Sequence, residues 1–267
     1  MGVGKQVHLN RLFGHPSGRL CSVAVDHFVG YQKGLPSGLV DLPRTIGQVV
    51  DGKPDAITMH KGPALSIWPR YAGKIPLIIQ SVNFVVDDSL IQVMVSVEEA
   101  LRMGADALAV AIAVRGTTEG KFLKILATAV EEAARWDFPI ISHIYPRDYS
   151  GQPTIVHDPE NIAWAVRCGI ECGADVIKVP YTGDPKSYGQ IIASCPVPLV
   201  AAGGPKAETL EEALGLMKGV VDSGARGATI GRNIWGFPKV TAAVKAFLAV
   251  VHDGASPKSA MTSAGLP

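Results

Sequence analysis

The stretch Gly173-Ala174-Asp175-Val176-Ile177-Lys178-Val179 decides the fold of this chain. An amphipathic segment ends at its glycine, as helices commonly do, and a short apolar run follows, as a buried strand does. The same Gly-Ala-Asp occurs at 104–106, and Gly224-Ala225-Arg226-Gly227 introduces a third apolar run. This weak internal repeat predicts that helices alternate with parallel strands.

Short runs rich in Val, Ile, Leu and Ala recur along the chain, at 20–25, 55–59, 76–81, 106–112, 139–145, 175–179, 197–202 and 227–231. Apolar residues at three- and four-residue spacing indicate helices between most of them, most clearly at 118–136, 159–172 and 207–223. Nearly continuous apolar strands are typical of parallel sheets covered on both faces. We therefore expect an α/β protein with a single (β/α)8 TIM barrel. An open doubly wound sheet is the alternative, because a sequence does not show closure.

The composition indicates a globular enzyme with a large core. Of the 267 residues, 47% are hydrophobic and 18% charged, and the net charge of +1 gives no electrostatic preference for nucleic acid. We expect one domain over 1–252. The remainder, 253–267, is rich in Gly, Ser, Ala and Pro, and we expect a flexible C-terminal tail there, or an arm that orders against another subunit. Gly2-x-Gly4-Lys5 lacks the spacing of a phosphate-binding P-loop, and we expect a flexible terminus there.

The cysteines and the N-terminus indicate the compartment. Cys21, Cys168, Cys172 and Cys195 form no Cys-x-x-Cys pair, and free apolar thiols are typical of a reducing environment. The N-terminal residues, Met1 to His8, lack the long apolar segment that is typical of a signal peptide, and no apolar run approaches the roughly 20 residues that span a bilayer. We expect a cytoplasmic protein without a membrane partner.

The unusual polar residues follow the ends of the expected strands, where the active sites of such barrels lie. They are Asp26, His27, His60, Lys61, Gln80, Asn83, His143, Tyr145, Arg147 and, within the sixth strand, Lys178. A barrel brings all of these strand ends to one rim. We therefore expect His27, His60, Lys61, His143 and Arg147 to contact a substrate.

Lys178 lies in an apolar strand, where desolvation favours the neutral amine that attacks a carbonyl. Its ketone adduct, an iminium, is an electron sink that lets a nearby carbon–carbon bond break or form. Tyr145, on the neighbouring strand, is our candidate for moving the hydroxyl proton, and Asp26 for assisting it. The alternatives are a lysine that extends to water along the strand and an aspartate that caps a turn.

Two glycine-containing loops predict a phosphate site. Gly203 and Gly204 follow the seventh strand, and Gly231 and Arg232 follow the eighth. In this fold the loops after strands seven and eight often bind phosphate through backbone amides, and a guanidinium adds a planar pair of donors. We infer a phosphorylated sugar or ketone as substrate.

These residues stand in segments that resemble the class I (Schiff-base) aldolases of the DeoC/LacD-like superfamily. This family includes the archaeal-type fructose-bisphosphate aldolases, the aminodideoxyheptulosonate synthases and the enzyme that processes phosphorylated autoinducer-2. The matching segments are Ala24-Val25-Asp26-His27, Met59-His60-Lys61-Gly62, Tyr145-Pro146-Arg147, Ile177-Lys178-Val179-Pro180-Tyr181-Thr182-Gly183, Ala202-Gly203-Gly204-Pro205-Lys206 and Ile230-Gly231-Arg232-Asn233-Ile234-Trp235.

The resemblance implies a carbon–carbon lyase with a dihydroxyacetone phosphate donor. In such an enzyme Lys178 forms the Schiff base, Tyr145 is the acid–base residue and Asp26 its partner, and the glycines with Arg232 hold the phosphate. It also implies a homo-oligomer, often a decamer, and no cofactor. Three departures put fructose 1,6-bisphosphate itself in question: the loop Phe28-Val29-Gly30-Tyr31-Gln32-Lys33-Gly34-Leu35-Pro36, His143 in place of a tryptophan or apolar residue, and Asp148 in place of a glycine.

Three other interpretations stay open. His27, His60 and His143 could hold a divalent metal, although they show no compact spacing and leave Lys178 unexplained. A non-catalytic barrel could bind a sugar phosphate as a sensor, because fold alone does not imply chemistry. Within the family, the same lysine could support acyl or ketol transfer on another sugar phosphate. Our reading assigns no metal.

Overall fold

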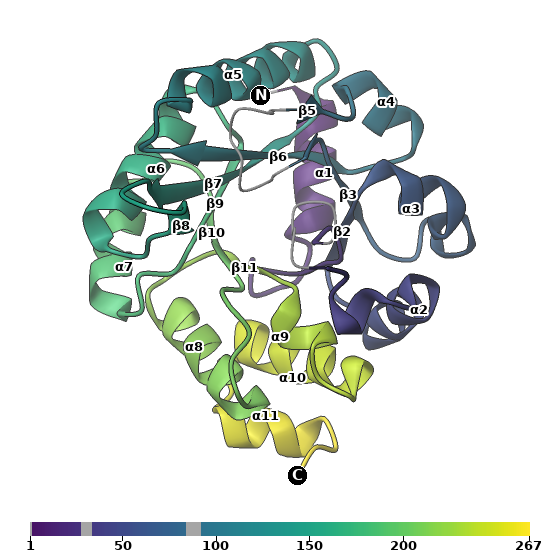
Figure 1. Cartoon of the computed structure of the whole chain (residues 1–267). Coiled ribbons are helices and arrows are strands. Elements are labelled where there is room, and N and C mark those ends of the chain that lie inside the picture. The colour runs from purple at the N-terminus through teal and green to yellow at the C-terminus, as the bar shows by residue number, and fades with distance from the viewer. Residues whose placement is uncertain (1, 28–33, 84–91) are drawn as a thin grey trace.

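The computed structural model describes residues 2–27, 34–83 and 92–267 and has eight parallel strands that close into a barrel in this part of the chain (Figure 1). Hydrogen bonds join them in the order β6-β3-β2-β1-β11-β10-β9-β7, and β7 pairs with β6 over seven positions to close the ring. The (β/α)8 prediction is thereby confirmed, and the open sheet was wrong. The strands are β1 (Leu20–Ala24), β2 (Ala56–Met59), β3 (Leu77–Gln80), β6 (Ala107–Val114), β7 (Ile140–Asp148), β9 (Val176–Val179), β10 (Leu199–Ala202) and β11 (Gly227–Ile230).

Helices surround the barrel (Figure 1). They are α2 (Leu42–Gly52), α3 (Lys61–Ser66), α4 (Val97–Arg102), α5 (Glu119–Ala134), α6 (Pro159–Glu171), α7 (Pro185–Ala193), α8 (Leu210–Asp222), α9 (Arg232–Trp235) and α10 (Val240–Asp253), with 3-10 turns at Ser37–Leu39 and Trp68–Tyr71. Their apolar faces and the outer faces of the strands form the larger hydrophobic core. Capping residues set the start of several helices: Asp158 and Asp184 each precede a proline, and Thr209 with Glu212 forms a capping box.

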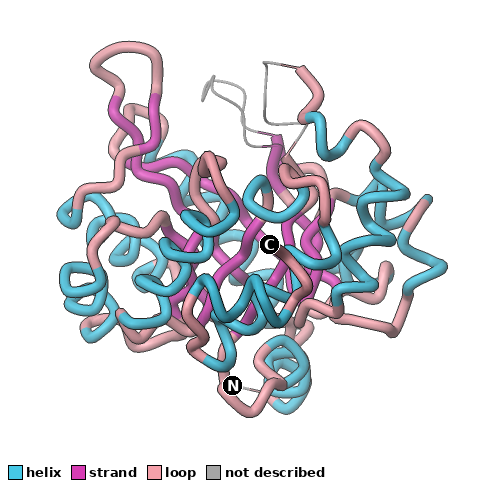
Figure 2. The backbone as a smooth tube through the Cα atoms, turned by 90° about the horizontal axis from the view of Figure 1, so that it is seen from below, coloured by secondary structure: helices cyan, strands magenta, loops and turns pink. Residues whose placement is uncertain are grey.

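The lower end of the barrel interior is apolar and is closed by α1 (Val3–Leu12). Leu12 is fully buried among inward-facing strand residues, and Leu9 and Phe13 pack beside it. Figure 2 shows the helix lying below the strands. Our prediction of a flexible N-terminus was therefore wrong. It failed because so few apolar residues of the helix contact the barrel that no clear helical periodicity results.

Ion pairs hold α1 in this position. Lys5 Nζ lies 2.9 Å from an oxygen of Asp175, and His8 and Arg11 each lie 3.1 Å from an oxygen of Asp106. These two carboxylates belong to the repeated Gly-Ala-Asp motif. The motif thus starts two strands and also binds the helix that closes the barrel.

The C-terminal segment contains a further helix, α11 (Pro257–Ser263), which packs against α10 and α8. The Ser256 hydroxyl accepts a hydrogen bond from the Ser259 N–H, Pro257 occupies the first turn, and Ala260 is fully buried. Our expectation of a tail without regular structure was therefore wrong for 257–263. Ser-Pro is a helix-start signal, but a helix of seven residues is too short to show a periodic pattern.

Two small antiparallel pairs extend the upper end of the barrel. One joins β7 to β8 (Thr154–Ile155), with Arg147 opposite Ile155, and the other joins β4 (Val82–Asn83) to β5 (Gln92–Val93). The β7–β8 hairpin projects from the end opposite α1 (Figure 2). All four cysteines are free, as expected. None of the described helices combines the length and apolar composition that crossing a membrane requires.

Candidate active site

Lys178 lies inside the barrel and is 5% exposed. Its neighbours in register are His143 on β7 and Val200 on β10. Below it the barrel interior is filled by the apolar residues that α1 covers, so its head does not reach water at that end. The lysine therefore points into the upper half of the barrel, where the polar strand ends gather.

A cavity of about 120 Å³ opens there. Ten of the twelve predicted site residues line it: Asp26, His27, His60, His143, Tyr145, Lys178, Gly203, Gly204, Gly231 and Arg232. They come from six strands and the loops after them. The parallel barrel brings these distant segments together because all of its strands end at the same rim.

Lys61 and Arg147 do not line this cavity. Lys61 begins α3, its side chain is 40% exposed, and its Nζ lies 3.2 Å from Glu99, so its prediction as a substrate contact is not supported. Arg147 is buried on β7, two residues beyond Tyr145, and its charge acts on the Tyr145 hydroxyl.

Asp26 is at the centre of a polar network. One oxygen accepts a hydrogen bond from Gln80 Nε2 at 3.2 Å, the other lies 3.5 Å from His27 Nδ1, and His60 Nε2 donates to the Asp26 carbonyl oxygen at 3.0 Å. Burial raises the pKa of Asp26, but the surrounding histidines, His27 first, and Lys178 outweigh burial and lower it to about 2. Asp26 is therefore a carboxylate at neutral pH.

His27 and His143 are neutral at physiological pH. Burial lowers the pKa of His27 to about 4, even though Asp26 acts in the opposite direction. Burial, followed by the charge of Lys178, also lowers the pKa of His143 well below its usual value. The cavity thus contains neutral imidazoles beside a carboxylate and a lysine.

Tyr145 is the phenol closest to this network. Burial first, and then the charge of Asp26, raise its pKa above the usual value of a tyrosine, while Arg232 and Arg147 act in the opposite direction. Tyr145 is therefore protonated at neutral pH and can donate a proton or a hydrogen bond.

The two glycine loops are joined to each other at the far side of the cavity. Arg232 donates to the Gly204 carbonyl oxygen at 3.2 Å, and Asn233 Nδ2 donates to the carbonyl oxygens of Gly203 and Pro205 at 2.8 and 2.9 Å. A Cβ on Gly231 would lie 2.3 Å from the His27 ring, so only glycine fits there. The loops are thus held close together, with their backbone facing the cavity.

The lining residues without a predicted role include Gln80, Ile155, His157 and Thr229. Gln80 ends a predicted strand, and that position was the one signal available from the sequence. Ile155 and His157 reach the cavity because β7 and β8 form a hairpin, which the sequence did not reveal. His157 Nδ1 donates to the Tyr181 carbonyl oxygen at 3.0 Å, which connects the hairpin to the loop that follows Lys178.

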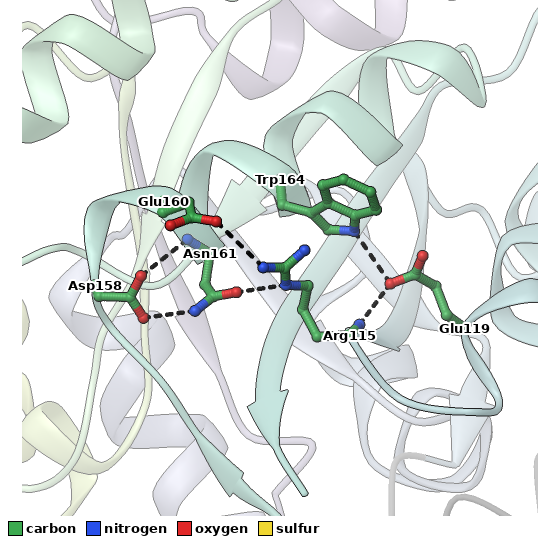
Figure 3. Close-up of polar contacts among 6 residues, drawn as sticks. All are labelled: Arg115, Glu119, Asp158, Glu160, Asn161 and Trp164. Atoms are coloured by element: carbon green, nitrogen blue, oxygen red, sulfur yellow. Dashed lines mark hydrogen bonds and ion pairs between the residues drawn. The ribbon is translucent and has the colours of Figure 1, made fainter.

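The start of α6, next to this hairpin, is held by Arg115 (Figure 3). Arg115 has a φ of 78°, which is unusual for a residue other than glycine. Its guanidinium donates to Asn161 and lies 4.7 Å from the ring centre of Trp164, whose Nε1 donates to Glu119. The Arg115 backbone N–H also donates to Glu119. This cluster connects the β6–α5 loop to α6 and supports the rim next to His157.

Two further expectations concern metal and the first loop. Within 2–27, 34–83 and 92–267, no three His, Cys, Asp or Glu side chains are arranged to hold a metal ion, so the geometry does not support the three-histidine centre. The distinctive first loop, 28–36, lies for the most part outside the described residues, which resume at Gly34.

The family model for the DeoC/LacD family aldolases matches residues 20–236, which include every strand of the barrel. The chain belongs to this aldolase family. It is therefore a class I, Schiff-base type of enzyme that forms or cleaves carbon–carbon bonds, and the non-catalytic alternative was wrong.

This aldolase is similar to two synthases and to a fructose-1,6-bisphosphate aldolase. It is 34% identical over 265 residues to the 2-amino-3,7-dideoxy-D-threo-hept-6-ulosonate synthase of Halobacterium salinarum, covering 98% of this chain and 97% of the relative. It is 30% identical over 266 residues to the 2-amino-4,5-dihydroxy-6-oxo-7-(phosphonooxy)heptanoate synthase of Streptomyces griseus, covering 98% and 95%. An archaeal fructose-1,6-bisphosphate aldolase, solved with its catalytic lysine covalently bound to a carbinolamine intermediate, superposes with a TM-score of 0.82 at 28% identity, covering 93% and 99%.

Proposed function

We propose that Lys178 forms the Schiff base of this aldolase with a phosphorylated ketose or ketone, with dihydroxyacetone phosphate as the donor. The observation that carries the proposal is the position of Lys178. It is the one amine among the described residues that line the barrel cavity, and it lies beside an ionised carboxylate and a protonated phenol. A desolvated amine next to proton-transfer groups is the arrangement that imine chemistry requires.

In this reaction the neutral Lys178 amine adds to the ketone carbon. The carbonyl oxygen gains one proton from the amine nitrogen and a second from an acid and leaves as water, and an iminium remains. The iminium accepts the electron pair of the carbon–carbon bond that breaks. Tyr145, a neutral phenol at pH 7, donates the second of these protons to the departing hydroxyl and becomes a phenolate. The phenolate takes the proton of the hydroxyl on the carbon that becomes the aldehyde as the carbon–carbon bond breaks, and the phenol returns it to the aldehyde oxygen when the bond forms. Asp26, ionised throughout, stabilises the iminium charge and accepts hydrogen bonds from substrate hydroxyls.

The phosphate is bound by Gly203, Gly204, Gly231 and Arg232. Arg232 contributes a permanent positive charge, and its hydrogen bond to Gly204 orients the guanidinium at the junction of the two loops. The name of the Streptomyces relative supports a ketone adjacent to a phosphorylated carbon, because it specifies a 6-oxo group beside a 7-phosphonooxy group.

Two candidate reactions differ in the aldehyde partner. The structural similarity to an archaeal fructose-1,6-bisphosphate aldolase supports a fructose 1,6-bisphosphate-like substrate. The second candidate, transfer between two substrates on another sugar phosphate, is favoured by the two synthases, which match nearly the full length of this chain. Assay of fructose 1,6-bisphosphate cleavage against a panel of aldehyde acceptors distinguishes the two.

We also propose a homo-oligomer, such as a decamer, in the cytoplasm. Exposed apolar side chains, among them Trp136, Trp164 and Leu216, support self-association. Light scattering after size-exclusion chromatography measures the oligomer, and a monomer at micromolar concentration would contradict it.

Borohydride reduction in the presence of dihydroxyacetone phosphate, followed by mass spectrometry and peptide mapping, tests the central proposal. We expect one reduced adduct, on Lys178, and none in Lys178→Met. Lys218→Met is the matched control, because Lys218 lies on the outer helix α8 and pairs with Asp222, and it should react like the wild type. Absence of an adduct with this and other ketone phosphates would refute the role of Lys178.

A further inference from the structure

Gln80 is held in one orientation by three contacts. Its Oε1 accepts a hydrogen bond from the Val82 backbone N–H at 3.3 Å. Its Nε2 lies 3.2 Å from an oxygen of Asp26 and 3.2 Å from Nδ1 of His143. Asp26 is ionised and can only accept, so the atom facing it must be the NH2 group. The same NH2 group therefore donates its second hydrogen toward His143.

This contact determines the tautomer of His143. Nδ1 accepts from Gln80 and therefore carries no proton, so the neutral ring has its proton on Nε2. Gln80 and His143 lie on β3 and β7, with β6 between them. The inward-facing residues of β6 at this level are alanines, Ala109 and Ala111, which leave space for the contact across the strand. The alternating alanines in the sequence Ala-Leu-Ala-Val-Ala of β6 thus allow Gln80 to reach His143 across this strand.

His143 is fixed as a donor beside Lys178. It is 2% exposed and is the register partner of Lys178 on the adjacent strand. The charged and titratable groups that act on the ring are Lys178, Asp26 and His27. Burial and the Lys178 charge lower the pKa of His143, so the ring stays neutral around pH 7. Because Nδ1 faces Gln80, the Nε2–H on the opposite side of the ring faces the cavity.

We infer that Gln80 holds His143 as the neutral Nε2–H tautomer and that this N–H hydrogen-bonds the substrate's ketone oxygen while Lys178 attacks. The inference rests on the proposed Schiff-base role of Lys178. A neutral imidazole can polarise a carbonyl in this way without transferring its own proton.

His143 is not consumed when Lys178 adds to the ketone. The Lys178 nitrogen forms a bond to the ketone carbon as the carbon–oxygen π bond breaks, and the electron pair moves to the oxygen, which His143 stabilises. The oxygen then takes the proton that the nitrogen loses, giving the carbinolamine, and His143 keeps its own proton. Gln80 is a positioning residue, because it acts through His143 and Asp26.

Three substitutions of His143 distinguish the effect of losing its hydrogen-bond donor from the effect of losing its packing. A glutamine amide nitrogen reaches about as far as Nε2, whereas an asparagine amide reaches only to Nδ1. We expect His143→Gln to keep the rate of borohydride-trapped adduct formation within about 10-fold of wild type, and His143→Asn and His143→Leu to lose about 10²–10³-fold, the usual effect of removing one such donor. Equal rates for the glutamine and asparagine variants would overturn the inference.

The tautomer itself is measured by long-range ¹H–¹⁵N spectroscopy of the imidazoles, with the His143 signals assigned by their loss in His143→Gln. We expect a protonated Nε2 and an unprotonated Nδ1 in the wild type from pH 6 to 8, and a tautomer mixture in Gln80→Leu. A wild-type ring with the proton on Nδ1, or one that titrates in this range, would refute the inference. Loss of the Lys178 adduct in the wild type would instead refute the proposed function, so the two failures are distinguishable.

Discussion

Gly231→Ala is expected to lower both stability and catalytic activity. Gly231 lies in the glycine loop after β11 and packs against His27, the residue next to Asp26. A Cβ there would lie 2.3 Å from Cε1 of His27 and 3.1 Å from the Ala24 carbonyl oxygen. Carbon atoms in contact are about 3.5–4.0 Å apart. The His27 ring would therefore have to retreat by about 1 Å.

The surroundings of His27 resist this movement. Trp235 packs edge-on against the ring, with the centroids 5.2 Å apart, and is itself fixed by the hydrogen bond from its Nε1 to the Ala24 carbonyl oxygen. Overpacking of this kind costs about 1–3 kcal/mol, and misplacing a catalytic group by about 1 Å can lower a rate about 10²-fold. We expect the free energy of unfolding to fall by about 1–3 kcal/mol and kcat/KM to fall about 10²-fold.

Urea denaturation measures the first quantity, and cleavage of the best ketose phosphate substrate measures the second. Gly120→Ala is the matched control, because Gly120 lies within α5 and a Cβ there meets no atom within 4 Å. Removing a glycine from a helix should raise stability by up to about 1 kcal/mol and leave catalysis unchanged. If Gly231→Ala unfolds at the wild-type urea concentration and keeps the wild-type kcat/KM, our account of the packing between the loop and His27 is wrong.

Three further outcomes are expected. Tyr145→Phe should lower turnover about 10²–10⁴-fold yet still give a borohydride-trapped adduct on Lys178, because proton transfer is lost and the amine is not; unchanged turnover would assign the shuttle to another group. Asp26 has a folded pKa of about 2, below its unfolded value of about 4, so it contributes about 2 kcal/mol of stability above pH 4 that is lost as the pH falls toward 2. In urea titrations at pH 6 and pH 3, the wild type should therefore lose more stability than Asp26→Asn, and equal losses would contradict the lowered pKa. Thr209→Ala should remove the capping box with Glu212 and cost about 0.5–2 kcal/mol in the free energy of unfolding without changing kcat/KM, and a loss of activity at unchanged stability would argue against a purely structural cap.

The positions of the eight barrel strands could be predicted from the sequence, whereas their closure rests on the pairing of β7 with β6 in the structure. A strand buried on both faces must be apolar along its length, and the chain must turn after each one, so both signals lie within a few neighbouring residues. Lys178 was conspicuous for the same reason, since a charged side chain interrupts such a strand. The gathering of the candidate site residues at strand ends followed from the topology, because a parallel barrel brings all its carboxyl ends to one rim.

Contacts between distant segments were decided only in the tertiary structure. Lys61 follows a strand end as His60 does, yet its side chain turns outward to Glu99, a choice of direction that no local pattern records. The contact between Gln80 and His143 crosses a strand of alanines and depends on the barrel's register. The helices α1 and α11 form because the barrel and α10 offer apolar surfaces to a few residues each. Local sequence thus determined the barrel strands, most of the helices around them and the candidates for chemistry. The short helices α1 and α11, the direction of each side chain and its partners depended on packing between elements far apart in the chain.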